Sequence, residues 1–292
     1  MESGRELIAR IRKSMSESLF TGGDDARTFE ARIIAENVTG DSYSELMVSS
    51  YELTARQISD IDAIITQRNT GKPLAYILRS VTFRELDLYV DERVLIPRSE
   101  TEIVVQHALD ILSRHPEPAK DLNVVDVGTG SGAIALSVAY EEMRAQVIAS
   151  DISAEAIDVA RLNGVATGSS AVRVKFFCGD LFSALPEELQ GTVDVIVSNP
   201  PYIGNDEKED LDSSVLEYEP HLALFAGEEG SDIYGRIIDQ ARDWLKEDGR
   251  LVLEIAPRHV EFIKQSAINN GYTNTEIFSD LTGRERIAVL TL

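Results

Sequence analysis

The chain has 292 residues, more than one ordinary core of about 100–150 residues, so we expect two domains. Apolar residues make up 43% and charged residues 27%, a composition that is typical of a globular protein and excludes wholesale disorder. The 50 acidic and 28 basic residues give a formal net charge of −22, which disfavours a protein that holds nucleic acid or anionic lipid by broad electrostatic attraction.

Residues 1–78 show the periodicity of a helical domain. Apolar residues recur at helical spacing in two stripes: Leu7, Ile8, Ile11, Met15 and Leu19, then Ile58, Ile61, Ile64 and Ile65. A further helix runs from about 26 to 38 and stops at Gly40, while capping-box spacing predicts helix starts at Ser42 and Thr54. The residues leave open a purely structural bundle and a module that grips a macromolecular substrate.

Residues 79–97 change to the two-residue period of strands. The runs 81–90 and 94–96, on either side of a turn at 91–93, predict a β-hairpin that links the two domains. Ser99, with an acid three positions later, predicts a capping box for the helix that follows.

From Leu122 onward strands alternate with helices, which indicates a parallel sheet with crossover helices. The strand candidates end at Val127, Ser150, Phe177, Ser198 and Ile255, and helical patterns cover 133–143, 154–163 and 232–245. The last two candidates, 273–278 and 286–292, are too close for a crossover helix and should pair antiparallel. The fold class is therefore α/β, with parallel strands and a C-terminal antiparallel hairpin.

The chain shows no disulfide, metal or membrane signal. Cys178 is the only cysteine and lies in an apolar run, so we expect a buried structural thiol and a reducing, cytoplasmic compartment. The four histidines show no metal-ligand spacing, and we expect no metal. No apolar run approaches the roughly 20 residues that span a bilayer, and the charged first residues do not resemble a signal peptide.

A glycine-rich segment joins the first strand of the sheet to a helix. It reads Gly128, Thr129, Gly130, Ser131 and Gly132, and glycine allows tight turning and close approach to a ligand. Asp151 ends the next strand, where a carboxylate can accept both hydroxyl hydrogen bonds of a ribose. Together they favour a nucleoside-bearing cofactor. The spacing also fits a nicotinamide dinucleotide or an empty tight turn. Asp180 ends the third strand at the same sheet edge, although a chance surface carboxylate is an equal interpretation.

The fourth strand leads into Asn199, Pro200, Pro201 and Tyr202. Two prolines remove two backbone donors and stiffen the segment, which leaves the Asn199 side-chain oxygen and the Pro200 carbonyl as acceptors. Two such acceptors can fix the plane of an NH₂ group on a conjugated centre, and Tyr202 offers a flat surface to pack on it. Since an amide or exocyclic amine is a weak nucleophile, orientation and polarisation are the available catalytic effects.

These motifs resemble the class I S-adenosylmethionine-dependent amino-methyltransferases, and more narrowly the peptide chain release factor glutamine N5-methyltransferase family. The similarity extends over about 71–292 and includes the segments 71–77, 94–102, 217–224, 249–255 and 280–286. Three places depart from the family pattern. Arg79 stands where glycine is usual, Ser99 stands where proline is common, and the segment 256–259 replaces a stretch that commonly carries glycine and glutamine. None of these departures touches the expected chemical centre.

The resemblance implies methyl transfer from S-adenosylmethionine to the side-chain amide nitrogen of the glutamine in the Gly-Gly-Gln loop of a class 1 release factor. It implies a Rossmann-like methyltransferase domain over 98–292, a hairpin linker over 79–97 and a helical substrate-recognition domain over 1–78. The cofactor residues would be Gly128, Thr129, Gly130, Ser131, Gly132, Asp151, Asp180, Leu181 and Asn199. Asn199, Pro200 and Tyr202 would be catalytic, and substrate would also meet Pro201, Arg98 and Glu100. A structural Arg–Glu pair is an equally fair interpretation of the last two.

Three alternative functions compete with this interpretation. An adenine-N6 methyltransferase of DNA or RNA could present a flipped base to the same tetrapeptide. However, residues 128–292 hold 28 acidic and 13 basic residues, and 205–219 hold seven acids and one lysine, which would repel a phosphate backbone. A nucleotide-binding adaptor would need neither Asn199 nor the glycine loop, and a nicotinamide oxidoreductase leaves the tetrapeptide unexplained. The charge is also compatible with an adaptation to a salty cytoplasm.

Overall fold

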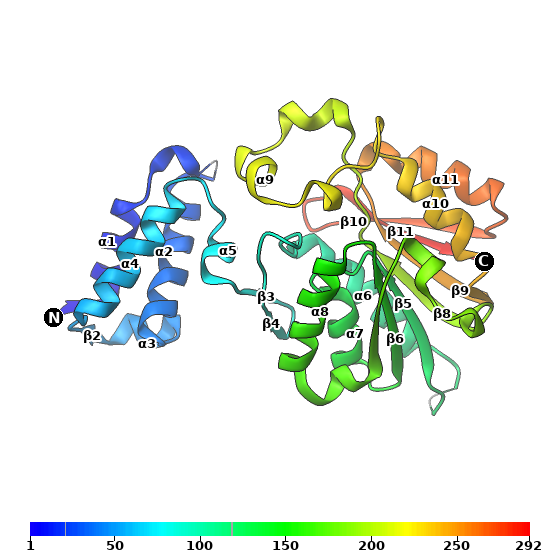
Figure 1. Cartoon of the computed structure of the whole chain (residues 1–292), viewed down its shortest axis with the longest axis horizontal. Coiled ribbons are helices and arrows are strands. Elements are labelled where there is room, and N and C mark those ends of the chain that lie inside the picture. The colour runs from blue at the N-terminus through cyan, green and yellow to red at the C-terminus, as the bar shows by residue number, and fades with distance from the viewer. Residues whose placement is uncertain (21, 118) are drawn as a thin grey trace. The chain divides into compact units, whose positions relative to one another are not determined.

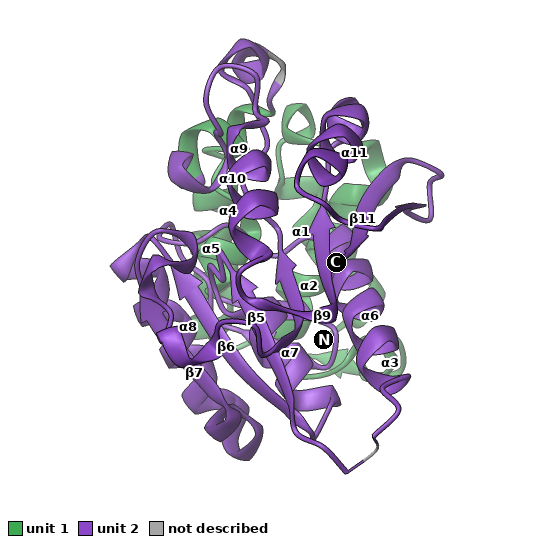
Figure 2. Cartoon of the chain, turned by 90° about the vertical axis from the view of Figure 1, so that its right-hand side faces the viewer, with its two compact units in different colours: residues 1–79, 212–218 green, residues 80–211, 219–292 purple. Residues whose placement is uncertain are grey.

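The computed structural model describes residues 1–20, 22–117 and 119–292, which divide into two compact units (Figure 2). Unit 1 comprises Met1–Arg79 together with Asp212–Tyr218. Unit 2 comprises Ser80–Leu211 and Glu219–Leu292. A short segment from the second half of the chain therefore belongs to the N-terminal unit.

Unit 1 is helical and has its own apolar core. Its elements are β1 (Glu2–Ser3), α1 (Gly4–Ser14), α2 (Gly23–Thr39), α3 (Tyr43–Val48), β2 (Ser50–Tyr51), α4 (Ala55–Arg68), α5 (Leu74–Leu78) and α9 (Ser213–Tyr218). The expected capping boxes form at Ser42 and Thr54, and Gly40 ends α2 with a φ of +79°. The prediction of a second apolar stripe, over 58–65, is partly wrong. Ile61 and Ile65 are buried, whereas Ile58 is exposed because it lies one turn before the part of α4 that contacts the core.

Unit 2 is built on one mixed sheet of seven strands within the described residues (Figure 1). The strands are β5 (Leu122–Val127), β6 (Ala145–Asp151), β7 (Val174–Cys178), β8 (Val193–Ser198), β9 (Leu245–Glu254), β10 (Asn274–Ser279) and β11 (Glu285–Thr291). Their spatial order is β10-β11-β9-β8-β5-β6-β7. The five strands from β5 to β9 pair in parallel, and β11 pairs antiparallel with both β9 and β10. The predicted α/β class and terminal hairpin are confirmed.

Helices cover both faces of this sheet (Figure 1). On one face α6 (Ser99–Ser113) and α7 (Ala133–Glu141) pack against the strands, with α8 (Ala154–Thr167) beside α7. On the other face lie α10 (Asp232–Ala241) and α11 (Val260–Asn269). Because β5, β6 and β8 are buried on both sides, they carry nearly unbroken apolar runs. The strand order reverses between β5 and β8, which opens a crevice at their carboxyl ends.

The β-hairpin of residues 79–97 exists, but it is shorter than expected. Only β3 (Val81–Phe83) and β4 (Leu86–Leu88) pair, around a turn at Arg84 and Glu85, and 94–96 form no strand. Arg84 stabilises the earlier turn. It adopts a φ of +51°, and its guanidinium binds both carboxylate oxygens of Glu141 at 2.6 and 2.7 Å. The sequence predicted the turn at 91–93 instead, because an ion pair between residues 57 positions apart leaves no local signal.

The prediction of a capping box at Ser99 is also wrong. The cap of α6 is Arg98, and the Ser99 hydroxyl donates to Glu100 instead. The carboxylate of Glu102, expected to complete the box, accepts the backbone N–H of Arg84 at 3.1 Å. A tertiary partner thus replaces the local one.

Cys178 is exposed, contrary to the expected buried thiol. It ends β7, which is an edge strand of the sheet, so one side of its side chain has no neighbouring strand to cover it. Among the described helices, none has the length and apolar composition needed to cross a membrane.

Candidate active site

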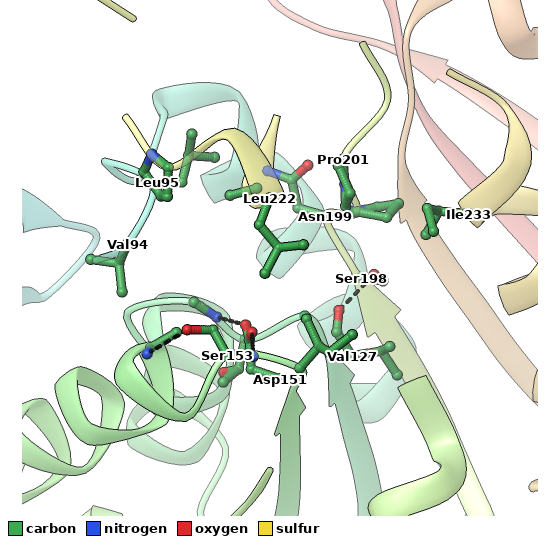
Figure 3. A pocket seen from close by; sticks show the side chains of 18 of the residues that line it. Val94, Leu95, Val127, Asp151, Ser153, Ser198, Asn199, Pro201, Leu222 and Ile233 are labelled. Carbon is green, nitrogen blue, oxygen red and sulfur yellow. Dashed lines mark hydrogen bonds between the residues drawn. The ribbon is translucent and has the colours of Figure 1, made fainter. Parts of the chain in front are cut away.

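A cavity of about 230 Å³ opens at the carboxyl ends of β5, β6 and β8, where the strand order reverses (Figure 3). Ten of the expected site residues line it: Gly128, Thr129, Gly130, Ser131, Asp151, Asp180, Leu181, Asn199, Pro200 and Pro201. Gly132, Tyr202, Arg98 and Glu100 do not. The crevice lies where open α/β sheets bind their ligands.

The glycine loop forms the floor of the cavity. Gly128, Gly130 and Gly132 have φ values of +75°, +55° and +85°, a region that side-chain-bearing residues adopt at a cost. No atom lies within 4 Å of where a Cβ on Gly128 or Gly130 would be, so both backbones are open to a ligand. Gly132 differs, because a Cβ there would meet Leu136 at 3.1 Å and the Cβ of Ala160 at 3.3 Å. The first two glycines allow approach from the cavity, and the third allows helices α7 and α8 to pack.

Asp126, one residue before the end of β5, holds the loop from below. Its Oδ2 accepts the Thr129 hydroxyl at 2.6 Å and the Ala135 N–H at 3.1 Å, while Oδ1 is buried without a partner among the described residues. Burial raises the pKa of this carboxyl to about 7. Asp126 was not predicted as a site residue, because a strand residue's contact with the next helix depends on the turn between them.

Asp151 lies on the opposite side of the cavity from Asn199 and Leu222 (Figure 3). Its Oδ2 accepts the Gly130 N–H at 2.8 Å and its Oδ1 accepts the Ser153 N–H at 2.9 Å. Burial raises its pKa, and these two hydrogen bonds oppose that effect. Each carboxylate oxygen keeps a further lone pair, so the group can still accept hydroxyl donors from a ligand.

Asp180 and Leu181 form another part of the wall. Leu181 adopts a φ of +51°, and its carbonyl accepts the hydroxyl of Ser150 at 3.0 Å. Non-glycine residues with this backbone conformation cluster at ligand sites, where surrounding contacts hold them. Asp180 pairs with Arg236 of α10 at 2.5 Å. Arg236 also lines the cavity and was missed, because nothing in the local sequence of α10 distinguishes a pocket arginine from a surface one.

Asn199 directly follows β8, and its orientation is fixed by α6. Its Nδ2 donates to the hydroxyl of Thr101 at 3.0 Å, so its Oδ1 is left without a partner among the described residues. The hydroxyl of Ser198 is turned away and donates to the carbonyl of Val127 at 2.6 Å (Figure 3). Pro200 and Pro201 also line the cavity. The region therefore presents acceptors, as two prolines without N–H groups require.

Tyr202 is partly buried and packs against the apolar cluster that includes α10 and α11. Burial raises the pKa of its phenol to about 12, so the ring carries no charge at neutral pH. Arg258 holds its backbone by donating to the Tyr202 carbonyl at 3.3 Å and to the Glu229 carbonyl at 3.2 Å. The segment 256–259, which departs from the family pattern, thus holds the backbone at the end of the tetrapeptide through Arg258.

Arg98 and Glu100 do not pair with each other. The guanidinium of Arg98 binds the carboxylate of Glu219, a buried side chain that also accepts the N–H of Ile96 at 3.3 Å. Glu100 accepts the hydroxyl of Ser99 at 3.0 Å. Arg98 therefore connects the start of α6 to the chain just before Pro220, which lines the cavity.

Much of the remaining wall is apolar and was not predicted. It includes Val94, Leu95, Ile152, Leu222, Phe225 and Ile233. Such residues look like ordinary core in sequence, because only the fold brings them to one surface. Among the described residues, no group of three or more potential metal ligands occurs.

Two family models match the chain. The PrmC N-terminal domain matches residues 10–78, and the methyltransferase small domain matches residues 103–217. The chain is 35% identical to the release factor glutamine methyltransferase of Rhodopirellula baltica over 267 residues, which covers 91% of this chain and 89% of that one.

Longer relatives also match. The chain is 32% identical to the bifunctional methyltransferase of Rickettsia typhi and covers 56% of that protein's length. The fold is similar to that of the hMettl16 catalytic domain in complex with MAT2A 3′UTR hairpin 6, with a TM-score of 0.54, 13% identity, and coverage of 82% of this chain and 83% of that one.

Proposed function

Because the chain belongs to the release factor glutamine methyltransferase family, we propose that it transfers a methyl group from S-adenosylmethionine to the side-chain amide nitrogen of a glutamine in a class 1 peptide chain release factor. The glutamine would be that of the Gly-Gly-Gln loop. Since translation terminates in the cytoplasm, we propose that location for the enzyme.

The cavity fits the cofactor on its own geometry. Gly128 and Gly130 leave open backbone where a Cβ would otherwise stand, which suits the methionine end. The carboxylate of Asp151 keeps acceptor capacity for ribose hydroxyls, and Leu181 and Ile152 supply apolar surface for a base. The bound cofactor would supply an electrophilic methyl group on a sulfonium.

Asn199 and Pro200 would orient the substrate amide. With Nδ2 bound to Thr101, the free Oδ1 of Asn199 can accept one N–H of the glutamine amide, and the Pro200 carbonyl can accept the other. Two acceptors would fix the plane of the nitrogen and polarise both N–H bonds. They would stay hydrogen-bonded to the N–H groups until the nitrogen, having gained the methyl group that the sulfonium gives up, loses one proton to solvent.

Unit 1 and the acidic segment after the tetrapeptide would bind the release factor. Unit 1 contains the part that matches the PrmC N-terminal domain and carries no catalytic motif. Residues 205–219 hold seven acids and a single lysine. Glu219 is bound to Arg98 and Glu207 to Arg258, and the other acids give a charge suited to a basic protein loop and unsuited to a phosphate backbone.

The observation that carries the proposal is the free Oδ1 of Asn199 in the wall of a cavity floored by the glycine loop. The test is to incubate the protein with S-adenosylmethionine and a purified class 1 release factor and to map methylation by mass spectrometry. We expect one added methyl on the glutamine of the Gly-Gly-Gln loop. Methyl transfer to DNA or RNA with none to the release factor would refute the proposal.

A further inference from the structure

A chain of two hydrogen bonds runs from Asn199 into the interior of unit 2. Nδ2 of Asn199 donates to Oγ1 of Thr101 at 3.0 Å, and that hydroxyl donates to Oε2 of Glu254 at 2.6 Å. Thr101 and Glu254 are 4% and 2% exposed, so water does not compete for these bonds. Both residues lie in segments with family resemblance. Thr101 also lines the cavity, whereas Glu254 does not.

Three separate elements bring these groups together. Asn199 follows β8, Glu254 ends the neighbouring parallel strand β9, and Thr101 lies in the first turn of α6. The register pairs Ser198 with Leu253, so Asn199 and Glu254 come next in line on adjacent strands. The helix α6 then places one hydroxyl between an amide and a carboxylate.

The direction of these bonds decides which end of the Asn199 amide faces the cavity. A hydroxyl has one proton to donate, and an ionised carboxylate can only accept. Thr101 must therefore give its proton to Glu254 and offer only lone pairs to Asn199. A primary amide meets a lone pair with its NH₂ group, which turns Oδ1 towards the cavity. The opposite orientation would point NH₂ at the substrate's own NH₂ and offer no acceptor.

We propose that Thr101 and Glu254 are positioning residues for methyl transfer, and that together they hold the Asn199 amide with its oxygen towards the acceptor nitrogen. The inference rests on the proposed function in that the acceptor is an NH₂ group. Neither residue takes part in the chemical step. Their effect is on the fraction of enzyme molecules in which Asn199 can accept a hydrogen bond.

The two hydrogen bonds from Asn199 through Thr101 to Glu254, called the relay below, depend on the ionisation of Glu254. Burial raises the pKa of this carboxyl to about 7, against the hydrogen bond from Thr101, which lowers it. Glu100 acts in the same direction as burial, and Arg286 and Arg98 oppose it. The phenols of Tyr202 and Tyr234 also lie near and stay neutral. Once protonated, Glu254 can donate to Thr101, and the Thr101 hydroxyl is then free to donate to Oδ1 of a flipped Asn199. We expect kcat to fall as the pH drops below about 7.

The first test compares Thr101→Val with Thr101→Ser in methylation of a class 1 release factor. Valine keeps the shape and removes the hydroxyl, so we expect kcat to fall on the order of 10²-fold, since small errors in orientation have effects of this size. KM and the Kd for S-adenosylmethionine should change little. Serine restores the hydroxyl and should recover most of kcat. Equal kcat in the wild type and Thr101→Val, or no recovery with serine, would overturn the inference.

Glu254→Gln tests the carboxylate. A glutamine oxygen can still accept from Thr101 but does not titrate, so kcat should lose its dependence on pH near 7. Ser137→Ala is the matched control for Thr101→Val, because Ser137 is an equally buried hydroxyl in α7 without a partner among the described residues. It should keep the wild-type kcat and pH profile. An unchanged pH profile in Glu254→Gln contradicts the relay.

A measurement without substrate separates this inference from the proposed function. The side-chain ¹⁵N–¹H₂ signals of Asn199, assigned with Asn199→Ala, should show slow hydrogen exchange in the wild type and in Thr101→Ser, and at least about tenfold faster exchange in Thr101→Val. If the wild type transfers no methyl to any release factor, the proposed function fails while this result still tests the relay. Equal exchange rates in all three proteins would overturn the relay alone.

Discussion

Asn199 shows how one side chain gains a function from residues far away in sequence. The tetrapeptide predicted two acceptors, and the structure places Asn199 and Pro200 in the cavity wall. What the tetrapeptide could not predict is which end of the amide faces the cavity, because that depends on Thr101, 98 positions earlier. The motif thus specifies the atoms, and the fold specifies their direction.

Asn199→Ala should remove nearly all methyl transfer while cofactor binding largely survives. The substitution removes an acceptor aimed at the reacting nitrogen, and loss of one such group lowers kcat by about 10²–10³-fold. Isothermal titration calorimetry with S-adenosylmethionine should give a Kd within a few-fold of the wild-type value, since the glycine loop and Asp151 are untouched. Full activity in this variant would refute the assigned role.

Asp126 should make the free energy of unfolding depend on pH. Its pKa is about 7 in the folded protein against an ordinary value of 3.8, so folding favours the protonated form. The stability it contributes is therefore complete below pH 3.8 and is lost as the pH rises through about 7. Urea unfolding of the wild type between pH 5 and 8 should show a fall on the order of 2–4 kcal/mol larger than in Asp126→Asn. Parallel pH curves for the two proteins would contradict this account.

At the scale of elements, turns and helix ends show where local sequence decides and where it does not. The capping boxes at Ser42 and Thr54 were predictable because each involves residues three positions apart. The strand ends were predictable because buried parallel strands carry continuous apolar runs. The turn at Arg84 and the failed box at Ser99 were not, since both depend on Glu102 and Glu141 meeting Arg84 in the folded chain.

The same limit applies to the candidate site. The glycine loop, the strand-terminal acids, the tetrapeptide and the family resemblance together predicted ten residues that line the cavity. The strand-terminal ones lie together because parallel strands end at a common edge. Arg236, Leu222 and Phe225 could not be predicted, since their helix and loop carry no spacing that points to a ligand. Arg98 was paired with the wrong candidate, because Glu219 lies 121 positions away along the chain.

Arg79 ends α5 in a conformation that favours glycine. Its φ is +55° and its side chain is exposed, so Arg79→Gly should relieve backbone strain and lose few contacts. The relief of about 1–2 kcal/mol exceeds the extra chain entropy of glycine, and we expect a net gain of about 0.5–1 kcal/mol in unfolding free energy. Chemical denaturation would measure this. Arg79→Ala, which keeps the strain, is the control and should give no gain.

Two glycines of the glycine loop should respond differently to alanine. In Gly132→Ala the new Cβ meets both Leu136 and Ala160 in addition to backbone strain, so we expect a loss of about 2–4 kcal/mol in stability. In Gly128→Ala the Cβ enters open space, and the loss should be about 1–2 kcal/mol. The Cβ at 128 would however occupy the proposed cofactor space and weaken S-adenosylmethionine binding. Denaturation and calorimetry on both variants measure the two effects, and equal stability losses would contradict the packing argument.

At the scale of the whole molecule the net charge of −22 has two separable consequences. Like charges repel, so raising salt from about 10 to 150 mM, which shortens the screening length from about 30 to 8 Å, should raise the Tm by a few degrees. If the acidic segment binds a basic loop, kcat/KM for the release factor should fall over the same range. Asp206→Asn combined with Glu209→Gln should reduce this fall and leave the Tm response nearly unchanged. A kcat/KM that does not depend on salt would show that the charge does not contribute to substrate binding.

The membership of Asp212–Tyr218 in unit 1 has a consequence for synthesis on the ribosome. Tyr218 donates to the carbonyl of Thr70 at 3.2 Å, so the N-terminal unit lacks this contact until α9 has been translated. All of residues 80–211 must be made first, which takes roughly 7–26 s at a typical elongation rate of about 5–20 residues per second. During that interval the nascent N-terminal helices lack their contact with α9. Unit 1 is therefore complete only after most of the chain has been synthesised.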